Sequence, residues 1–289
     1  MSTMVAVSPT LRGDIDALHG LFNRLRESGF QPWAVPTSAG AQQRVDASGL
    51  PNVSIGANPG FGAAVTYGLT HVGAWDWALI INDDIELDAG ALSSVTSSLP
   101  SGDDEVMIYL DPVAPKSVPG LASTLGQVSL LSAVAQRLPA GAGSAERRGQ
   151  FRPFSIVLIS RGLWERLGGL DESLPYTFED ADFARRAGAV SADVRYPTLT
   201  GVRHPASATS RRHVDTVLPV AAWSAMSYLA KWHLPRPIAR GACVLALVAR
   251  LPITLVAPLD RRSHVRGVLS AVKALATDTA PALPLYDSL

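Results

Sequence analysis

Acidic residues at the end of an apolar run are the first candidates for chemistry in this sequence. Asn82, Asp83 and Asp84 directly follow the apolar run Trp77–Ile81. A buried strand that ends in carboxylates can hold Mg²⁺ or Mn²⁺, because both ions take oxygen ligands and are often shared with substrate phosphates. We expect Asp84 to be the main ligand, with Asn82 on the same side of the chain and Asp83 pointing elsewhere. The alternative is an ordinary turn, in which Asn and Asp bond the local backbone.

A second acidic cluster lies in residues 168–186, which read GGLDESLPYTFEDADFARR. Glu179, Asp180 and Asp182 are residue types that any first helical turn favours. A carboxylate held there, near the positive end of the helix dipole, can also act as a base and take a proton from an attacking hydroxyl. Asp180 and Asp182 are in addition a rival metal motif, although their position at a helix start favours base chemistry.

A glycine cluster precedes both acidic clusters, in residues 58–68, which read NPGFGAAVTYG. Glycines such as Gly60 and Gly62 let a backbone approach a ligand closely. The spacing does not match the G-x-G-x-x-G pattern of dinucleotide-binding loops. A tight turn before a helix is the plain alternative.

One histidine and two arginines further along the chain are additional candidates for metal and phosphate binding. A neutral His204 imidazole beside Asp84 and a diphosphate would suit Mn²⁺. Arg211 and Arg212 could bind the diphosphate, since guanidinium groups match phosphate oxygens in geometry. A structural histidine and a solvated arginine pair are the alternatives.

The elements that must position these residues alternate between strands and helices. Apolar runs predict strands at residues 4–8, 32–35, 53–55, 77–81, 106–110, 154–160 and 194–197. Helical spacing appears at residues 15–25, 61–72, 163–167 and from residue 218 onward, including 242–251. This alternation predicts an α/β fold with a mostly parallel mixed sheet flanked by helices, followed by a helical C-terminal region. Ligands of such sheets bind beyond the carboxyl ends of the strands.

Charge and cysteine content narrow the function classes. Residues 1–150 carry 8 basic and 14 acidic side chains, a net of −6, whereas residues 211–289 carry 10 and 4, a net of +6. The overall net charge of zero and the lack of a basic stripe argue against a nucleic-acid partner. Cys243 is the only cysteine, which predicts a reducing, cytoplasmic location.

The C-terminal helices offer a surface for a membrane or a protein partner. Residues 238–258 are apolar but contain Arg240, Arg250 and Pro252, so we expect no simple transmembrane helix. Aromatic and basic residues on an amphipathic face suit peripheral contact with the inner face of the cell membrane. A packing domain or the interface of a homo-oligomer fits the same pattern.

In combination, these segments resemble the family-two inverting GT-A glycosyltransferases, over roughly residues 4–212. Residues 75–87, WDWALIINDDIEL, resemble the D-x-D strand of that family. Residues 58–68 resemble its N-x-G-x-x-x-x-N-x-G box, with Thr66 where the family often has Asn. Residues 168–186 resemble its G-G-F-D-E and E-D-x-D-L-x-x-R motifs in order and spacing.

The resemblance implies a GT-A domain at residues 1–212, with a donor half at 1–110, a variable loop at 111–150 and an acceptor half at 151–212, and then a helical region at 213–289. It implies metal-dependent transfer of a sugar, with inversion, from a nucleoside-diphosphate-sugar to a hydroxyl of a glycan or lipid-linked acceptor in cell-surface polysaccharide assembly. Within the family the chain resembles bacterial rhamnosyl- and galactofuranosyltransferases, and a dTDP- or UDP-sugar is the expected donor.

The resemblance also implies a role for each site residue. Asp180 maps to the catalytic base, and Asp84 and His204 map to the metal ligands. Acceptor contacts, or orientation of the base, are implied for Asp171, Glu179 and Asp182, and donor contacts for Asn58, Gly60, Gly62, Asn82 and Asp83. Arg211 and Arg212 are further expected donor contacts on the chemistry of their guanidinium groups.

One segment departs from the family pattern. Residues 35–39 read VPTSA, where the family usually has an aspartate that contacts the nucleotide base. This departure leaves open a catalytically inactive GT-A relative that acts as a binding or partner subunit. A nucleotidyltransferase is a further alternative, which the Glu-Asp helix argues against.

Overall fold

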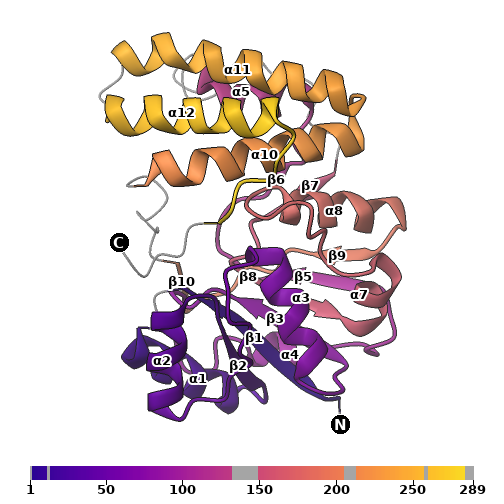
Figure 1. The fold of residues 1–289 in the computed structure, drawn as a ribbon. Helices are drawn as coiled ribbons and strands as arrows, with labels where there is room; N and C mark the ends of the chain where they lie inside the picture. Colours follow the sequence, from indigo (N-terminus) through magenta and orange to yellow (C-terminus); the bar gives the residue numbers. More distant parts are fainter. Residues whose placement is uncertain (1, 12–13, 132–148, 205–212, 257–259, 284–289) are drawn as a thin grey trace.

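The computed structural model describes residues 2–11, 14–131, 149–204, 213–256 and 260–283. A six-stranded sheet with its flanking helices occupies one half of the molecule in Figure 1, and long helices pack together in the other half.

The sheet has the strand order β2-β1-β3-β8-β5-β9. Its strands are β1 (Met4–Thr10), β2 (Gln31–Pro36), β3 (Trp77–Ile81), β5 (Val106–Tyr109), β8 (Ile156–Ser160) and β9 (Asp193–Arg195). Strand β1 is parallel to β2 and β3, and β5 is parallel to β9, whereas β8 is antiparallel to both β3 and β5. The predicted fold class, a mostly parallel mixed sheet flanked by helices, is therefore confirmed.

Two apolar layers cover the two faces of the sheet. On one face, α1 (Ile15–Glu27) buries Leu18, Phe22 and Leu25 beside Leu79 of β3. On the other face, α3 (Phe61–His71) and α8 (Glu179–Ala189) pack against the alternate side chains of the same strands, such as Ile80. Every residue of β3 and β8 is buried, as expected for strands covered on both sides.

Two short pairings bring distant segments together at the edge where β3 ends. Strand β4 (Glu86–Leu87) pairs with β10 (Val202–Arg203), and β6 (Lys116–Ser117) pairs with β7 (Gln150–Phe151). The β4–β10 pair is reinforced because Arg203 forms ion pairs with Glu86 and Asp88. Three shorter helices, α2 (Ala39–Ser48), α4 (Ser93–Thr96) and α7 (Arg161–Leu167), complete this half.

The sequence interpretation was wrong about the strand at residues 53–55. Only Asn52 forms a bridge, to Ala34, and the Val53 amide donates to the Ala34 carbonyl at 2.9 Å. The pairing stops because the chain turns at Gly56, which has a φ of +70°. Helix α2 was not expected, since it buries only Ala41 and Val45 and has little apolar periodicity.

The helical half consists of α10 (Val214–Trp232), α11 (Arg236–Val256) and α12 (Arg261–Ala276), with α5 (Leu121–Ser129) packed against them. Helices α10, α11 and α12 all lie in the C-terminal region that the sequence predicts to be helical. The core on the α3 and α8 side of the sheet continues without a break into these helices. Among the described residues, Arg236–Thr254 of α11 is the one segment long and apolar enough to cross a bilayer.

Candidate active site

The chain turns directly after β3, where Asn82, Asp83 and Asp84 lie. The Asn82 amide donates to the Ser155 carbonyl at 2.9 Å, and the Ile85 amide donates to the Asn82 carbonyl at 3.3 Å. Asp84 lies within this turn, and its Oδ1 atom is buried and has no hydrogen-bond partner. A buried carboxylate oxygen is costly unless it is bonded or coordinated. The turn therefore accounts for Asn82 but leaves the Asp84 oxygen unexplained.

His204 lies next to this oxygen, although 120 positions separate the two residues in the sequence. Pairing of β4, which follows Asp84, with β10, which ends at Arg203, brings the two residues together. The His204 Nε2 atom is 3.6 Å from Asp84 Oδ1, and its Nδ1 atom is 3.4 Å from Oδ2 of Asp111. The imidazole thus stands between two carboxylates.

Asp111 is the residue that the sequence analysis missed. Its side chain is fully buried, and it accepts a hydrogen bond from the Val113 amide at 2.8 Å and another from the Ser155 hydroxyl. Arg152 also donates to its carbonyl at 2.6 Å. The sequence does contain an indication of this residue. Asp111 directly follows the apolar run at residues 106–110, in the same way that the cluster at residues 82–84 follows β3.

The side chains at this edge fit a divalent cation shared with a ligand. Asp84 offers an unpartnered oxygen and His204 a ring nitrogen, both donors that Mn²⁺ accepts. Across the part of the chain that the structure describes, no group of three or more His, Cys, Asp or Glu side chains is arranged to hold a metal ion by itself. Two protein donors suffice where substrate phosphates supply the remaining ligands.

The second acidic cluster begins α8 from an unusual turn. Thr177 and Phe178, directly before Glu179, both have a φ of +71°. Residues other than glycine adopt this conformation at an energetic cost and are concentrated at functional sites. The turn buries Glu179, whose Oε2 atom has no hydrogen-bond partner, and leaves Asp180 half-buried. The Asp180 Oδ1 atom accepts a hydrogen bond from the Ala181 amide at 2.7 Å.

Burial shifts both carboxyl groups towards their protonated forms. Burial, and then the neighbouring Asp180 charge, raises the pKa of Glu179 to about 8. Burial also raises the pKa of Asp180 to about 6, against the opposing effect of the Ala181 amide. Such adjacent groups titrate as a pair, and burial favours the protonated forms of both. The raised pKa values place the titration of this pair closer to neutral pH than that of exposed carboxyl groups, which suits a group that takes up a proton.

The two clusters meet at the end of β5. Burial and then the Asp180 charge raise the pKa of Tyr109, the last residue of β5, well above its usual value. Tyr109 is two residues from Asp111, and its buried hydroxyl has no hydrogen-bond partner. The carboxyl pair of α8 and the His204 group are therefore both near the end of β5.

We expect the Glu179→Gln variant to lose a pH dependence of stability. Because the pKa of Glu179 is raised in the folded state, its contribution to stability is fully present below pH 4.5 and is lost as the pH rises through about 8. Thermal unfolding measured from pH 5 to 9 should show this decline in the wild type and a flatter profile in the variant. Parallel profiles would mean that Glu179 titrates normally.

Asp182 is fully buried and bonded on both oxygens. Its Oδ2 atom accepts from Arg186 Nε at 2.8 Å, and its Oδ1 atom lies 2.8 Å from both Trp232 Nε1 and Lys231 Nζ. Lys231 also contacts Asp171 Oδ2 at 2.5 Å. This geometry suits the expected role of orienting the base, because Asp182 is fixed near Asp180 on α8, and the expected acceptor contact stays a prediction.

Gly60 and Gly62 allow close packing within the chain itself. The Asn58 side chain accepts a hydrogen bond from the Gly60 amide at 3.2 Å. A Cβ atom on Gly60, which has a φ of +103°, would lie 2.3 Å from the Pro175 carbonyl oxygen. A Cβ atom on Gly62 would lie 3.3 Å from Leu170 Cβ. Both glycines thus allow close approach to the loop that carries the second acidic cluster, and their expected contact with the donor stays a prediction.

We therefore expect Gly60→Ala to be strongly destabilising. A methyl group at this position would clash with backbone atoms of Pro175 and would require a backbone conformation that alanine disfavours. Denaturant unfolding should show a loss of at least about 1 kcal/mol. Gly20→Ala is the matched control, since a Cβ atom there meets nothing within 4 Å, and an equal loss in both variants would contradict this packing.

Arg211 and Arg212, which we expect to contact the donor, lie outside the described residues. At the end of β2, where the family usually has an aspartate, the Thr37 hydroxyl donates to the Thr10 carbonyl at 3.2 Å and the Ser38 hydroxyl to the Leu11 carbonyl at 2.8 Å. These hydroxyls hold the ends of β1 and β2 together.

Comparisons with known proteins give only remote structural similarity. No protein-family model and no curated protein sequence matches the chain. It is similar to TarS residues 1–349 from S. aureus (TM-score 0.44, 10% identity, 96% of this chain and 92% of that one). It is also similar to CMP:2-keto-3-deoxy-manno-octonic acid synthetase complexed with CTP (TM-score 0.41, 14% identity, 71% and 95%). A third similar structure is GalNAc-T7 with UDP, GalNAc and Mn²⁺ (TM-score 0.47, 11% identity, 82% and 52%). At these scores the similarities carry no argument about the function of this chain.

Proposed function

We propose that this protein is a sugar-nucleotide-dependent glycosyltransferase that uses a divalent cation and inverts the anomeric centre. One observation carries the proposal. An unpartnered Asp84 oxygen beside His204 and a protonation-poised carboxyl pair at Glu179 and Asp180 lie at the same edge of one sheet. The resemblance of residues 58–68, 75–87 and 168–186 to glycosyltransferase motifs also supports this proposed activity.

The donor half would bind the nucleoside diphosphate through a shared cation. Asp84 and His204 would hold Mn²⁺ or Mg²⁺, with Asn82 and Asp83 near the donor. When bound, the ion neutralises the diphosphate and stabilises the charge that grows on the leaving group. Asp111 keeps His204 in place, because its carboxylate faces the other ring nitrogen.

The transfer step needs a base for the acceptor hydroxyl. The acceptor oxygen attacks the anomeric carbon, the bond from that carbon to the diphosphate oxygen breaks, and the acceptor proton passes to Asp180. An ionised Asp180 with a raised pKa is a stronger base than an exposed aspartate. Glu179 precedes it directly in the chain, and repulsion between the two carboxylates disfavours a second negative charge there.

The acceptor proposal includes contact with a membrane. Ile238, Leu245 and Val248 are exposed on one face of α11, and Val265 and Leu269 are exposed on α12. Such a face suits a lipid surface at which a lipid-linked glycan is presented. Flotation with anionic vesicles tests this part. We expect binding by the wild type and loss in Leu245→Glu, and no binding by either protein would remove the membrane contact.

An inactive relative is the second candidate, and the end of β2 favours it. Pro36 stands where the family's base-contacting aspartate usually lies, and the hydroxyls of the next two residues, Thr37 and Ser38, are bonded within the chain. This candidate predicts that the Asp180→Asn variant retains the full cellular role of the protein.

A thermal-shift screen tests the proposed donor. UDP-, dTDP- and GDP-sugars are titrated separately, each with Mn²⁺ and with EDTA. A ligand that binds only the native state raises the apparent melting temperature by mass action. We expect one nucleotide to give a shift that requires the metal. If no donor shifts the transition under either condition, the transferase proposal fails and the inactive relative is favoured.

A further inference from the structure

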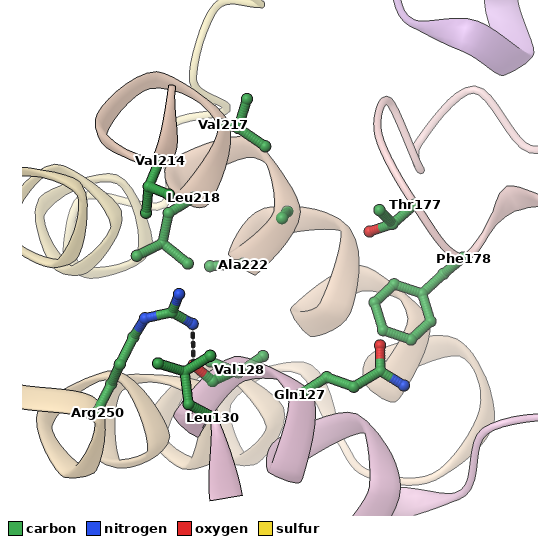
Figure 2. A pocket seen from close by; sticks show the side chains of 11 residues that line it. Gln127, Val128, Leu130, Thr177, Phe178, Val214, Val217, Leu218, Ala222 and Arg250 are labelled. Carbon is green, nitrogen blue, oxygen red and sulfur yellow. Dashed lines mark hydrogen bonds between the residues drawn. The ribbon is translucent and has the colours of Figure 1, made fainter. Parts of the chain in front are cut away.

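A cavity of about 240 Å³ lies among α5, α10, α11 and the turn before α8 (Figure 2). Its walls are mainly apolar, with Val128 from α5, Leu218 and Ala222 from α10, and Phe178 from the turn. Thr177, also in the wall, is exposed, so the cavity is open to solvent on that side. Nothing in the chemistry proposed above uses this cavity.

Arg250 places a buried charge in this apolar cavity. Its side chain reaches from α11 to a position between Leu218 and Val128 (Figure 2), and the residue is only 7% exposed. One guanidinium nitrogen donates to the Val128 carbonyl at 3.0 Å, while the buried Nε atom has no partner. Burial lowers the pKa of Arg250 to about 10.

No carboxylate in the described part of the chain forms an ion pair with Arg250. Buried arginines are normally paired, because the desolvation of an unpaired charge costs several kcal/mol. An oxyanion is the natural partner, since the guanidinium group presents donors in a geometry that matches phosphate and carboxylate oxygens. The surrounding Val, Leu and Ala side chains offer nothing to a polar ligand body but suit a hydrocarbon.

We propose that this cavity binds an amphiphilic oxyanion, with its phosphate or carboxylate head on Arg250 and its hydrocarbon part against Val128, Leu218 and Ala222. The site differs from the donor and base sites, and it does not depend on the chain being a transferase. Thr177 and Phe178 belong both to the cavity wall and to the turn that sets Glu179. The ligand would therefore contact the segment that positions the carboxyl pair.

Calorimetric titration with matched small molecules tests the proposal on the full chain. The probes are decyl phosphate, decanoate, decanol and inorganic phosphate, each below its micelle-forming concentration. We expect decyl phosphate or decanoate to bind at least about tenfold more tightly than both decanol and inorganic phosphate, because charge-assisted hydrogen bonds and apolar burial both contribute. Whichever acid binds more tightly identifies the head group.

Two variants separate the charge from the shape of the cavity. Arg250→Met keeps much of the side-chain volume but should weaken binding of the preferred acid at least about tenfold, and should leave decanol binding unchanged. Arg250→Lys should retain part of the affinity and remains informative if the Met variant does not fold. Arg266→Met, on the exposed part of α12, is the control and should bind like the wild type.

Amide hydrogen exchange tests whether the ligand contacts the turn at Thr177 and Phe178. Binding of the preferred acid should slow amide exchange within residues 177–182, because the ligand contacts Thr177 and Phe178. Three results would overturn the proposal: equal affinity of wild type and Arg250→Met for the acids, decanol binding as tight as that of the acids, or inorganic phosphate binding as tight as that of decyl phosphate.

Discussion

Sugar transfer by the Asp180→Asn variant is expected to be about 10²- to 10⁴-fold slower than by the wild type, the usual contribution of a general base. Asparagine has nearly the same shape, and its carbonyl can still accept the Ala181 amide that bonds Asp180 Oδ1 at 2.7 Å. The loss should therefore appear in kcat, while the donor still gives its metal-dependent thermal shift. Release of nucleoside diphosphate, followed by chromatography, measures the rate.

The pH profile gives an independent check on the same residue. Because Asp180 acts in its ionised form and burial raises its pKa to about 6, wild-type kcat should rise as the pH increases through that value. Glu172→Gln is the matched control, because Glu172 is an exposed carboxylate in the same motif. Equal loss in the two variants, or full activity of Asp180→Asn, would remove Asp180 as the base.

Asp182→Ala is expected to reduce stability by about 3 kcal/mol, a large effect for one residue. The substitution removes a fully buried carboxylate that bonds Arg186 and Trp232 and lies 2.8 Å from Lys231. Breaking one partner of a buried ion pair typically costs about 3–5 kcal/mol, and we take the lower end because Lys231 is partly exposed. Denaturant unfolding followed by circular dichroism measures the change.

An exposed ion pair supplies the control for Asp182. Asp193 bonds Arg195 at 2.6 Å, but the two side chains are 51% and 42% exposed. Surface pairs of this kind are worth about 1 kcal/mol or less, so Asp193→Ala should change stability little. A loss in Asp182→Ala no larger than in Asp193→Ala would show that the network does not hold α8 against α10.

Local sequence patterns were sufficient for the strands and helices that carry the acidic clusters. Strand β3 begins and ends where its apolar run does, because a strand buried on both faces has no polar positions to obscure its limits. The turn after it, and the start of α8 at Glu179, could also be read from residue types. Such elements are determined by burial and by capping preferences that act within a few residues.

Contacts between segments that are distant in the sequence could not be predicted from local sequence patterns. The partnership of His204 with Asp111 depends on which strands pair, and one apolar run gives no information on its neighbours. Gly60 and Gly62 pack closely against Pro175 and Leu170, a contact that the glycine spacing did not reveal. Nothing in the local sequence shows whether a glycine leaves space for a substrate or for another part of the chain.

The burial of the Arg250 side chain also could not be predicted from sequence patterns. In the sequence it interrupts an apolar run, which argues against a simple transmembrane helix. In the structure the residue is buried in a cavity beside α5 and α10. Its position depends on how three helices pack, which helical periodicity alone does not determine.

Titration of Mn²⁺ into the protein saturated with UDP or dTDP tests the central claim most directly. We expect binding that requires the nucleotide, weakened at least about tenfold in Asp84→Asn, since even residues behind metal ligands typically contribute that much. Asp104→Asn, an exposed carboxylate before β5 and thus at the opposite edge of the sheet, should bind Mn²⁺ like the wild type. Nucleotide-dependent binding that is unchanged in Asp84→Asn, or no binding by the wild type with either nucleotide, would contradict a cation-assisted donor site at the end of β3.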